Sequence, residues 1–156
     1  HRKIGFLLGD EYSLSLQERR RGYEDAMHAA HLYTSDRSII QTASSYAGGY
    51  EAGVRLLERG LDFTAVVCST ELMVLGLVSA MGDYRIAIPE QLSVASCDDG
   101  FYPQYYQITA TGGIGAEKPA RRASAVLLQK LKDPAAEVGT VVFRPELVVR
   151  SSVIKR

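Results

Sequence analysis

The stretch that decides the fold is Ala65-Val66-Val67-Cys68-Ser69-Thr70, which leads into a helical segment from Leu72 to Met81. A short, continuous apolar run that ends at two hydroxyl residues and precedes a helical pattern indicates a buried strand joined to a covering helix. The same order recurs, with strand-like runs at 4–8, 38–40 and 92–95 that end at Gly9-Asp10, near Thr42 and at Cys97-Asp98. Alternating strands and helices are typical of βαβ units, so the sequence predicts an α/β protein with a doubly wound parallel sheet.

Other segments complete the predicted element order. A capping-box match, Ser15-Leu16-Gln17-Glu18, predicts the start of the first helix. In the last third we expect a short strand within 105–111, a helix at 117–132 and two closing strands at 141–143 and 147–149. Pro119 fits the first turn of that helix, where proline is tolerated.

Composition and charge exclude several classes of protein. The 156 residues carry 18 basic and 18 acidic side chains, so the net charge is zero. A chain without net positive charge is by itself a poor candidate for nucleic-acid binding, because such binding requires positive charge against the phosphates. No apolar run approaches the roughly 20 residues of a membrane span. Two cysteines cannot form a secreted disulfide framework. The chain begins at His1 without an initiator Met or a signal peptide, so we expect it to be part of a longer protein.

Motifs for cofactors and catalysis are missing from the sequence. The glycine-rich stretch Gly112-Gly113-Ile114-Gly115 has neither dinucleotide-binding nor P-loop spacing. The three histidines lack a convincing third metal ligand, and no nucleophile–base pair is visible. We therefore expect no cofactor, no metal and no enzymatic activity. Cys68 and Cys97 are interpreted as buried structural thiols.

Polar side chains follow each predicted strand. They are Asp10, Thr42, Ser44, Ser69, Thr70, Glu71, Asp98 and Asp99, and Arg19 of the first helix can reach the same edge. Because ligands of open α/β sheets bind beyond the carboxyl ends of the strands, we expect these groups to line a site. Carboxylates that accept hydroxyl hydrogens, together with an arginine that donates to oxygen, suit a polyhydroxylated small molecule. For Ser44, Ser69 and Thr70 a purely structural, helix-capping role is an equally good interpretation.

The segment Leu72 to Met81 is apolar nearly all round, whereas a covering helix needs only one apolar stripe. We therefore expect Val74, Leu77, Val78 and Met81 to form a dimer interface. The competing explanation is that the carboxyl-terminal segment of the same chain covers this helix.

Five short segments form a series along the chain. They are His1-Arg2-Lys3-Ile4-Gly5-Phe6, Arg19-Arg20-Arg21-Gly22-Tyr23, Gly49-Tyr50-Glu51-Ala52, residues 88–94 followed by Asp98-Asp99, and residues 144–152. In this order, and over essentially the whole chain, they resemble the carboxyl-terminal part of the effector-binding core of LacI/GalR-type bacterial transcription regulators.

The resemblance implies a type I periplasmic-binding-protein-like fold, of which this chain forms the carboxyl-terminal subdomain. Residues 1–111 would be that effector-binding subdomain, residues 112–145 a crossover segment that completes the other subdomain, and residues 146–156 the closing strand and tail. Arg19 and Asp98 match effector-contacting positions of the family. Thr70 stands where the family usually has Asn, which leaves the identity of the sugar open.

The resemblance thus implies the effector-sensing and dimerising part of a cytoplasmic DNA-binding repressor with a sugar-like effector and no membrane partner. Operator DNA would be bound by an amino-terminal headpiece that this chain lacks, and the effector would shift the population of two conformations. The alternative is a periplasmic sugar-binding protein of a transporter, and an enzyme on a flavodoxin-like sheet is a third hypothesis.

Overall fold

Six strands form one sheet in the order β2-β1-β3-β4-β5-β6. In this computed structural model, residues 1–10, 12–112 and 117–156 are described. The strands are β1 (Ile4–Leu8), β2 (Ile39–Gln41), β3 (Ala65–Cys68), β4 (Ser93–Ser96), β5 (Thr109–Gly112) and β6 (Glu146–Val148). The first five are parallel, and β6 pairs antiparallel with β5. The predicted parallel sheet is confirmed, with an antiparallel strand at one edge.

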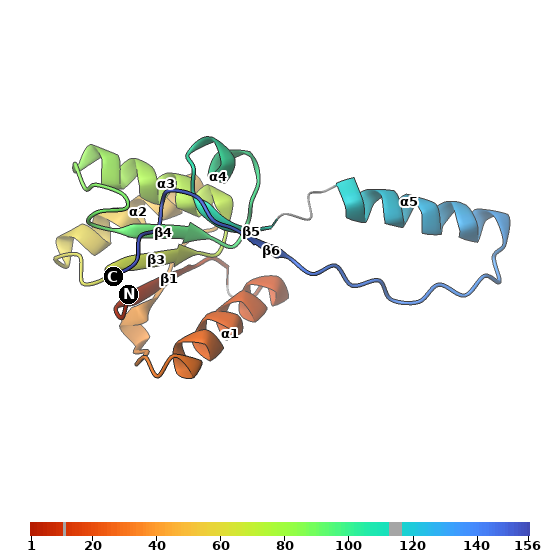
Figure 1. Ribbon diagram of the computed structural model, residues 1–156, viewed down its shortest axis with the longest axis horizontal. Helices are drawn as coiled ribbons and strands as arrows, with labels where there is room; N and C mark the ends of the chain where they lie inside the picture. Colours follow the sequence, from red (N-terminus) through yellow and green to blue (C-terminus); the bar gives the residue numbers. More distant parts are fainter. Residues whose placement is uncertain (11, 113–116) are drawn as a thin grey trace.

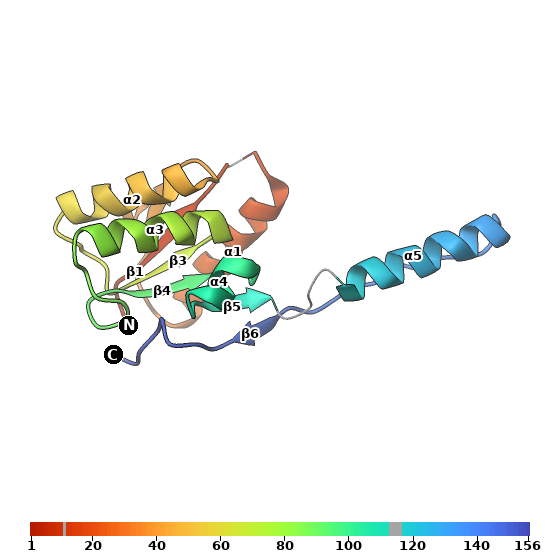
Figure 2. The same cartoon turned by 90° about the horizontal axis from the view of Figure 1, so that it is seen from above.

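Helices cover both faces of this sheet, as a doubly wound fold requires (Figures 1 and 2). They are α1 (Leu14–Ala29), the 3-10 turn η1 (Asp36–Ser38), α2 (Tyr46–Glu58), α3 (Glu71–Asp83), α4 (Phe101–Tyr105) and α5 (Glu117–Lys132). Helices α2 and α3 lie on one face and α1 lies on the other (Figure 1).

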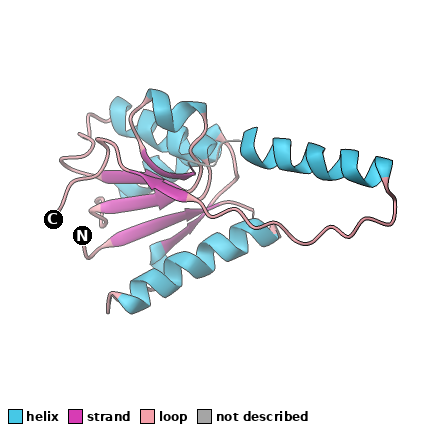
Figure 3. Cartoon of the chain, turned by 45° about the vertical axis from the view of Figure 1, so that its right-hand side comes forward, coloured by secondary structure: helices cyan, strands magenta, loops and turns pink. Residues whose placement is uncertain are grey.

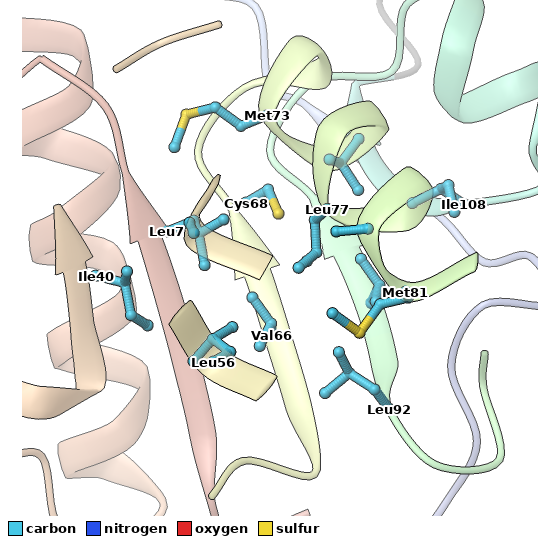
Figure 4. Close-up of a cluster of buried hydrophobic side chains, with 14 residues drawn as sticks. Leu7, Ile40, Leu56, Val66, Cys68, Met73, Leu77, Met81, Leu92 and Ile108 are labelled. Atoms are coloured by element: carbon cyan, nitrogen blue, oxygen red, sulfur yellow. The ribbon is translucent and has the colours of Figure 1, made fainter. Parts of the chain in front are cut away.

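The two faces explain why the strands are continuously apolar. In β1, Leu7 belongs to the core cluster under α2 and α3, drawn in Figure 4, whereas its neighbours Phe6 and Leu8 belong to the cluster under α1. The Phe6 ring stacks on Tyr23 of α1 with a centroid distance of 5.0 Å. Because successive side chains point to opposite faces, a strand covered on both sides needs apolar residues at every position.

Helices α2 and α3 approach each other so closely that only glycine fits at two contact points. A Cβ on Gly49 would overlap the Met73 carbonyl oxygen, and a Cβ on Gly76 would overlap the Tyr46 carbonyl oxygen. The contact between the two helices therefore depends on backbone approaching backbone.

This contact corrects the expected dimer interface. Val74, Leu77 and Met81 have exposed fractions of 1%, 0% and 0% in the single chain, and only Val78 is partly exposed. For Val74, Leu77 and Met81 the expectation of a second subunit is wrong, because the sheet and the neighbouring α2 together cover them. For Val78 the interface stays a prediction. The competing explanation is wrong as well, since α5 in the carboxyl-terminal third has no buried residue.

Some predicted boundaries also change. Helix α1 begins at Leu14 with Ser13 as its N-cap, so the capping box at Ser15 is wrong. The 105–111 segment starts at the end of α4, and strand β5 begins only at Thr109. Residues 141–143 form no strand, because nothing in the described chain pairs with them. The helix predicted at 117–132 is confirmed.

Helix α5 and the segment that returns to β6 extend away from the sheet (Figures 1 and 3). The chain leaves at the carboxyl end of β5 and returns through β6, and residues 113–116 of the glycine-rich stretch lie outside the described residues. The termini meet at the other end of the sheet, where the His1 amino group donates to the Arg156 carbonyl oxygen at 2.8 Å. Among the described helices, none has the length and apolar character of a membrane span.

Candidate functional site

The carboxyl ends of β1, β3 and β4 form one edge of the sheet, on the side from which the α5 segment leaves (Figure 1). The parallel register places Leu7 beside Cys68, and Cys68 beside Ser96. The residues that follow these strands therefore lie next to one another. We call this edge the carboxyl-end rim; it comprises Asp10, Ser69, Thr70, Glu71, Asp98 and Asp99, together with Arg19 of α1.

Arg19 and Asp98 form an ion pair at the rim, with 2.7 Å between Nη2 and Oδ1. The other terminal nitrogen of Arg19 donates to the Ser69 carbonyl oxygen, so the guanidinium is held at two points. The side chains are 28% and 34% exposed, which leaves both open to an incoming ligand. The structure thus brings together the two residues that the family resemblance assigns to the effector; the contact with an effector stays a prediction.

The serine hydroxyls of the rim are engaged by the backbone. The Ser44 hydroxyl accepts a hydrogen bond from the Asp10 amide at 3.1 Å, and the Ser69 hydroxyl accepts one from the Gly9 amide at 3.1 Å. Both therefore tie the end of β1 to its neighbours, which favours the structural interpretation of these two residues. The Asp10 carboxylate accepts from the Tyr12 amide at 3.0 Å and remains exposed.

Thr70 and Glu71 differ from the serines because each has one buried polar atom without a partner in the described part of the chain. Thr70 is the N-cap residue of α3 but makes no side-chain cap hydrogen bond. Its hydroxyl oxygen and the Oε2 atom of Glu71 are buried and have no hydrogen-bond partner among the described residues. The Glu71 carboxylate lies against Gly100, where an added Cβ would overlap it. Since buried polar groups are normally paired, these two atoms are candidate ligand contacts.

The adjacent acid, Asp99, has a partner that the sequence did not reveal. Arg150 binds its carboxylate with both terminal nitrogens, at 2.6 and 2.9 Å, and also donates to the Ile108 carbonyl oxygen at 2.7 Å. Arg150 is 13% exposed and Asp99 only 6%. Asp99 therefore anchors the closing segment of the chain. The two acids after β4 look alike in sequence, but only Asp98 faces the open rim.

Cys68 is a buried thiol, as expected, whereas Cys97 is only partly buried. Burial raises the pKa of Cys68 well above its usual value. Burial also raises the pKa of the Cys97 thiol to about 11, an effect opposed by Arg19 and reinforced by Asp98. Both thiols stay protonated at neutral pH and are poor nucleophiles. In the described part of the chain, no three His, Cys, Asp or Glu side chains gather in a way that could hold a metal ion.

Comparison with known families identifies this architecture. Residues 1–153 match the family model described as "Periplasmic binding protein-like domain". The chain belongs to this family.

Within the periplasmic-binding-protein-like family, the relatives of this chain are regulators. The HTH-type transcriptional regulator GalR of Salmonella typhimurium is 31% identical over 155 residues, which cover 98% of this chain and 45% of GalR. The HTH-type transcriptional repressor PurR of Haemophilus influenzae is 29% identical over 98% of this chain and 47% of PurR. A solved sugar-binding transcriptional regulator of the LacI family from Escherichia coli, complexed with phosphate, superimposes with a TM-score of 0.82 at 27% identity, over 99% of this chain and 55% of that structure.

These matches confirm the resemblance to LacI/GalR-type regulators and to their effector-binding core. This periplasmic-binding-protein-like chain spans about half the length of the curated relatives it matches. These relatives are transcription regulators, which favours that class over both the transport receptor and an enzyme.

Proposed function

We propose that this chain is the effector-sensing part of a DNA-binding transcription regulator and binds a small polyhydroxylated, sugar-like ligand at the carboxyl-end rim. The observation that carries this proposal is the partly exposed ion pair between Arg19 and Asp98. Carboxylate and guanidinium groups held side by side accept from and donate to neighbouring sugar hydroxyls. A related LacI-family regulator from Escherichia coli is a sugar-binding protein, which agrees with this ligand class.

The second wall of the ligand cleft belongs to a second subdomain. Residues 1–111 form the effector subdomain, residues 112–145 contribute to the other one, and residues 146–156 close the sheet. Helix α5 is amphipathic and has no buried residue. Its uncovered apolar side supports the assignment of residues 112–145 to the other subdomain. Operator binding by a cytoplasmic repressor then resides in a headpiece outside these residues, and effector binding shifts its conformational population.

Self-association uses the exposed side of α3 and the neighbouring α4 rather than buried α3 residues. Phe101 and Tyr105 of α4 are each 70% exposed, and their rings stack with centroids 6.1 Å apart. Leu72 of α3 is 41% exposed. Exposed apolar groups of this kind mark interaction sites. Tyr105→Asp is expected to convert a dimer into a monomer in sedimentation, whereas a wild type that is monomeric at micromolar concentration overturns this surface.

The ligand proposal is tested by titrating neutral hexoses, pentoses and disaccharides into the chain and following its backbone amide NMR signals, which detect weak binding. Arg19→Ala and Asp98→Ala are each expected to weaken binding by about 1.5–3 kcal/mol, roughly 10- to 150-fold, with an unchanged fold. Arg20→Ala, which removes the exposed Arg20–Glu24 pair from the same helix, is the matched control and should bind normally. Equal saccharide affinity in all four proteins would refute the assignment.

A further inference from the structure

A second group of hollows lies at the end of the sheet opposite the carboxyl-end rim and along the edge strand β2. Three connecting segments meet there: residues 1–3 before β1, residues 33–38 before β2, and residues 59–64 between α2 and β3. The hollows measure about 350, 210 and 410 Å³, and Arg37 lines all three. We call them together the amino-end groove.

Cationic side chains dominate the amino-end groove. Five of the chain's 18 basic residues line it, namely Arg2, Lys3, Arg37, Arg55 and Arg59, against Asp62 as the one acidic lining residue among those described. A chain of zero net charge thus concentrates positive charge at one end of its sheet.

In the described part of the chain, some arginines outside the groove form ion pairs and others, such as Arg85 and Arg144, do not. Arg20 and Arg21 on α1 and Arg121 on α5 each pair with a glutamate three or four residues away. Among the described residues, neither Arg37 nor Arg59 has a carboxylate within ion-pair distance. Their guanidinium groups are therefore available to an anion.

Helix stabilisation accounts for only part of this charge. Arg55 lies in the last turn of α2 and Arg59 is its C-cap, where cations favour the helix dipole. Arg55 also donates to the Gln41 carbonyl oxygen at 3.3 Å. Arg2 and Lys3 precede a strand, and Arg37 lies in a three-residue 3-10 turn that has no appreciable dipole. A bound anion would relieve the repulsion among these like charges.

We propose that the amino-end groove binds a small molecule that carries a phosphate group. Guanidinium groups bind phosphate through paired hydrogen bonds, and a dianionic phosphate can neutralise Arg37 and Arg59 together. The hollow between these two arginines is also lined by Phe63, whose partly exposed ring offers an apolar surface to a ring or alkyl portion. A volume of about 350 Å³ matches a small ligand rather than a protein segment.

This site is separate from the carboxyl-end rim and does not depend on the proposed function. Arg37 and Arg59 line hollows before β2 and after α2, whereas Arg19 and Asp98 lie at the carboxyl ends of β1, β3 and β4. Ligands of open α/β sheets usually bind at the carboxyl ends, so this second site departs from the general rule and rests on the local charge and the hollows between the arginines.

The test uses the 156-residue chain and follows the side-chain Nε–Hε NMR signals of its arginines. The probes are glucose 6-phosphate against glucose, adenosine monophosphate against adenosine, and inorganic phosphate. We expect saturable shifts of Arg37 and Arg59 with at least one phosphorylated probe below about 10 mM, and none with its phosphate-free counterpart. Binding should weaken several-fold when salt rises from about 50 to about 200 mM.

Variants locate the binding. Arg37→Gln and Arg59→Gln should each weaken phosphate binding about tenfold. Because both side chains are exposed, we expect both variants to fold, and thermal unfolding checks this. Arg21→Gln, which removes an exposed arginine of α1, is the matched control and should bind as wild type does.

Three results would overturn the proposal. The first is the absence of saturable shifts with every phosphorylated probe, and the second is equal affinity in Arg37→Gln, Arg59→Gln and wild type. The third is binding of polyglutamate with no binding of the phosphate esters, which would assign the groove to an acidic protein segment. The proposed saccharide site at the rim is tested by a separate titration, so none of these results would refute it.

Discussion

Replacing Arg150 by alanine tests what holds the closing segment to the sheet. Arg150 makes two charged hydrogen bonds to Asp99, at 2.6 and 2.9 Å, and a third to the Ile108 carbonyl oxygen at 2.7 Å. The substitution leaves the Asp99 carboxylate, which is 6% exposed, without its counter-charge. Breaking a buried pair in this way typically costs about 3–5 kcal/mol, whereas a domain has about 5–15 kcal/mol in all.

The loss in free energy of unfolding caused by Arg150→Ala is measured by urea unfolding, followed by far-UV circular dichroism at constant pH. Asp99→Asn keeps the shape of the side chain and leaves Arg150 its bond to Ile108, so we expect a smaller loss of about 1–3 kcal/mol. The double variant should lose less than the sum of the two single variants, because the second substitution removes a group that is already unpaired.

Arg121→Ala is the matched control, because it removes an arginine–glutamate pair whose side chains are 79% and 74% exposed. Exposed pairs contribute little, so we expect no change beyond about 0.5 kcal/mol. If Arg150→Ala lowers the free energy of unfolding by no more than this control, the pair does not anchor the closing segment and the reasoning is wrong.

Two further predictions concern packing and pH. Gly49→Ala should destabilise the chain by about 1–3 kcal/mol in the same urea assay, since its Cβ overlaps a carbonyl of α3, whereas Gly22→Ala in α1, with open space around it, should be neutral or stabilising. The pKa of the Cys97 thiol is raised to about 11, so the unfolded chain loses this proton at lower pH than the folded chain does. The stability that Cys97 contributes should be complete below about pH 8.5 and fall as pH rises towards 11, by at most about 1.4 kcal/mol per pH unit; a constant difference between wild type and Cys97→Ala from pH 8 to 11 contradicts this.

The order of strands and helices could be predicted because each βα unit is encoded locally. The apolar run at 65–68 and the helix after it both appear where the sequence places them. The burial of Leu77 could not be predicted from its own helix. It depends on how closely α2 approaches, and that approach is set by glycines such as Gly49 that carry no hydrophobic signal.

At the carboxyl-end rim, too, contacts set by the strand order could be predicted from the sequence, whereas contacts between distant segments could not. Parallel topology alone brings the ends of β1, β3 and β4 together, so the grouping of Arg19 with Asp98 was accessible from the sequence once the strands were assigned. The partner of Asp99 was not accessible, because Arg150 lies 51 residues further along the chain and reaches it only after β6 pairs with β5. Two identical side chains in succession thus have different partners: the buried Asp99 carboxylate fixes the closing segment through Arg150, and the partly exposed Asp98 carboxylate pairs with Arg19 at the rim.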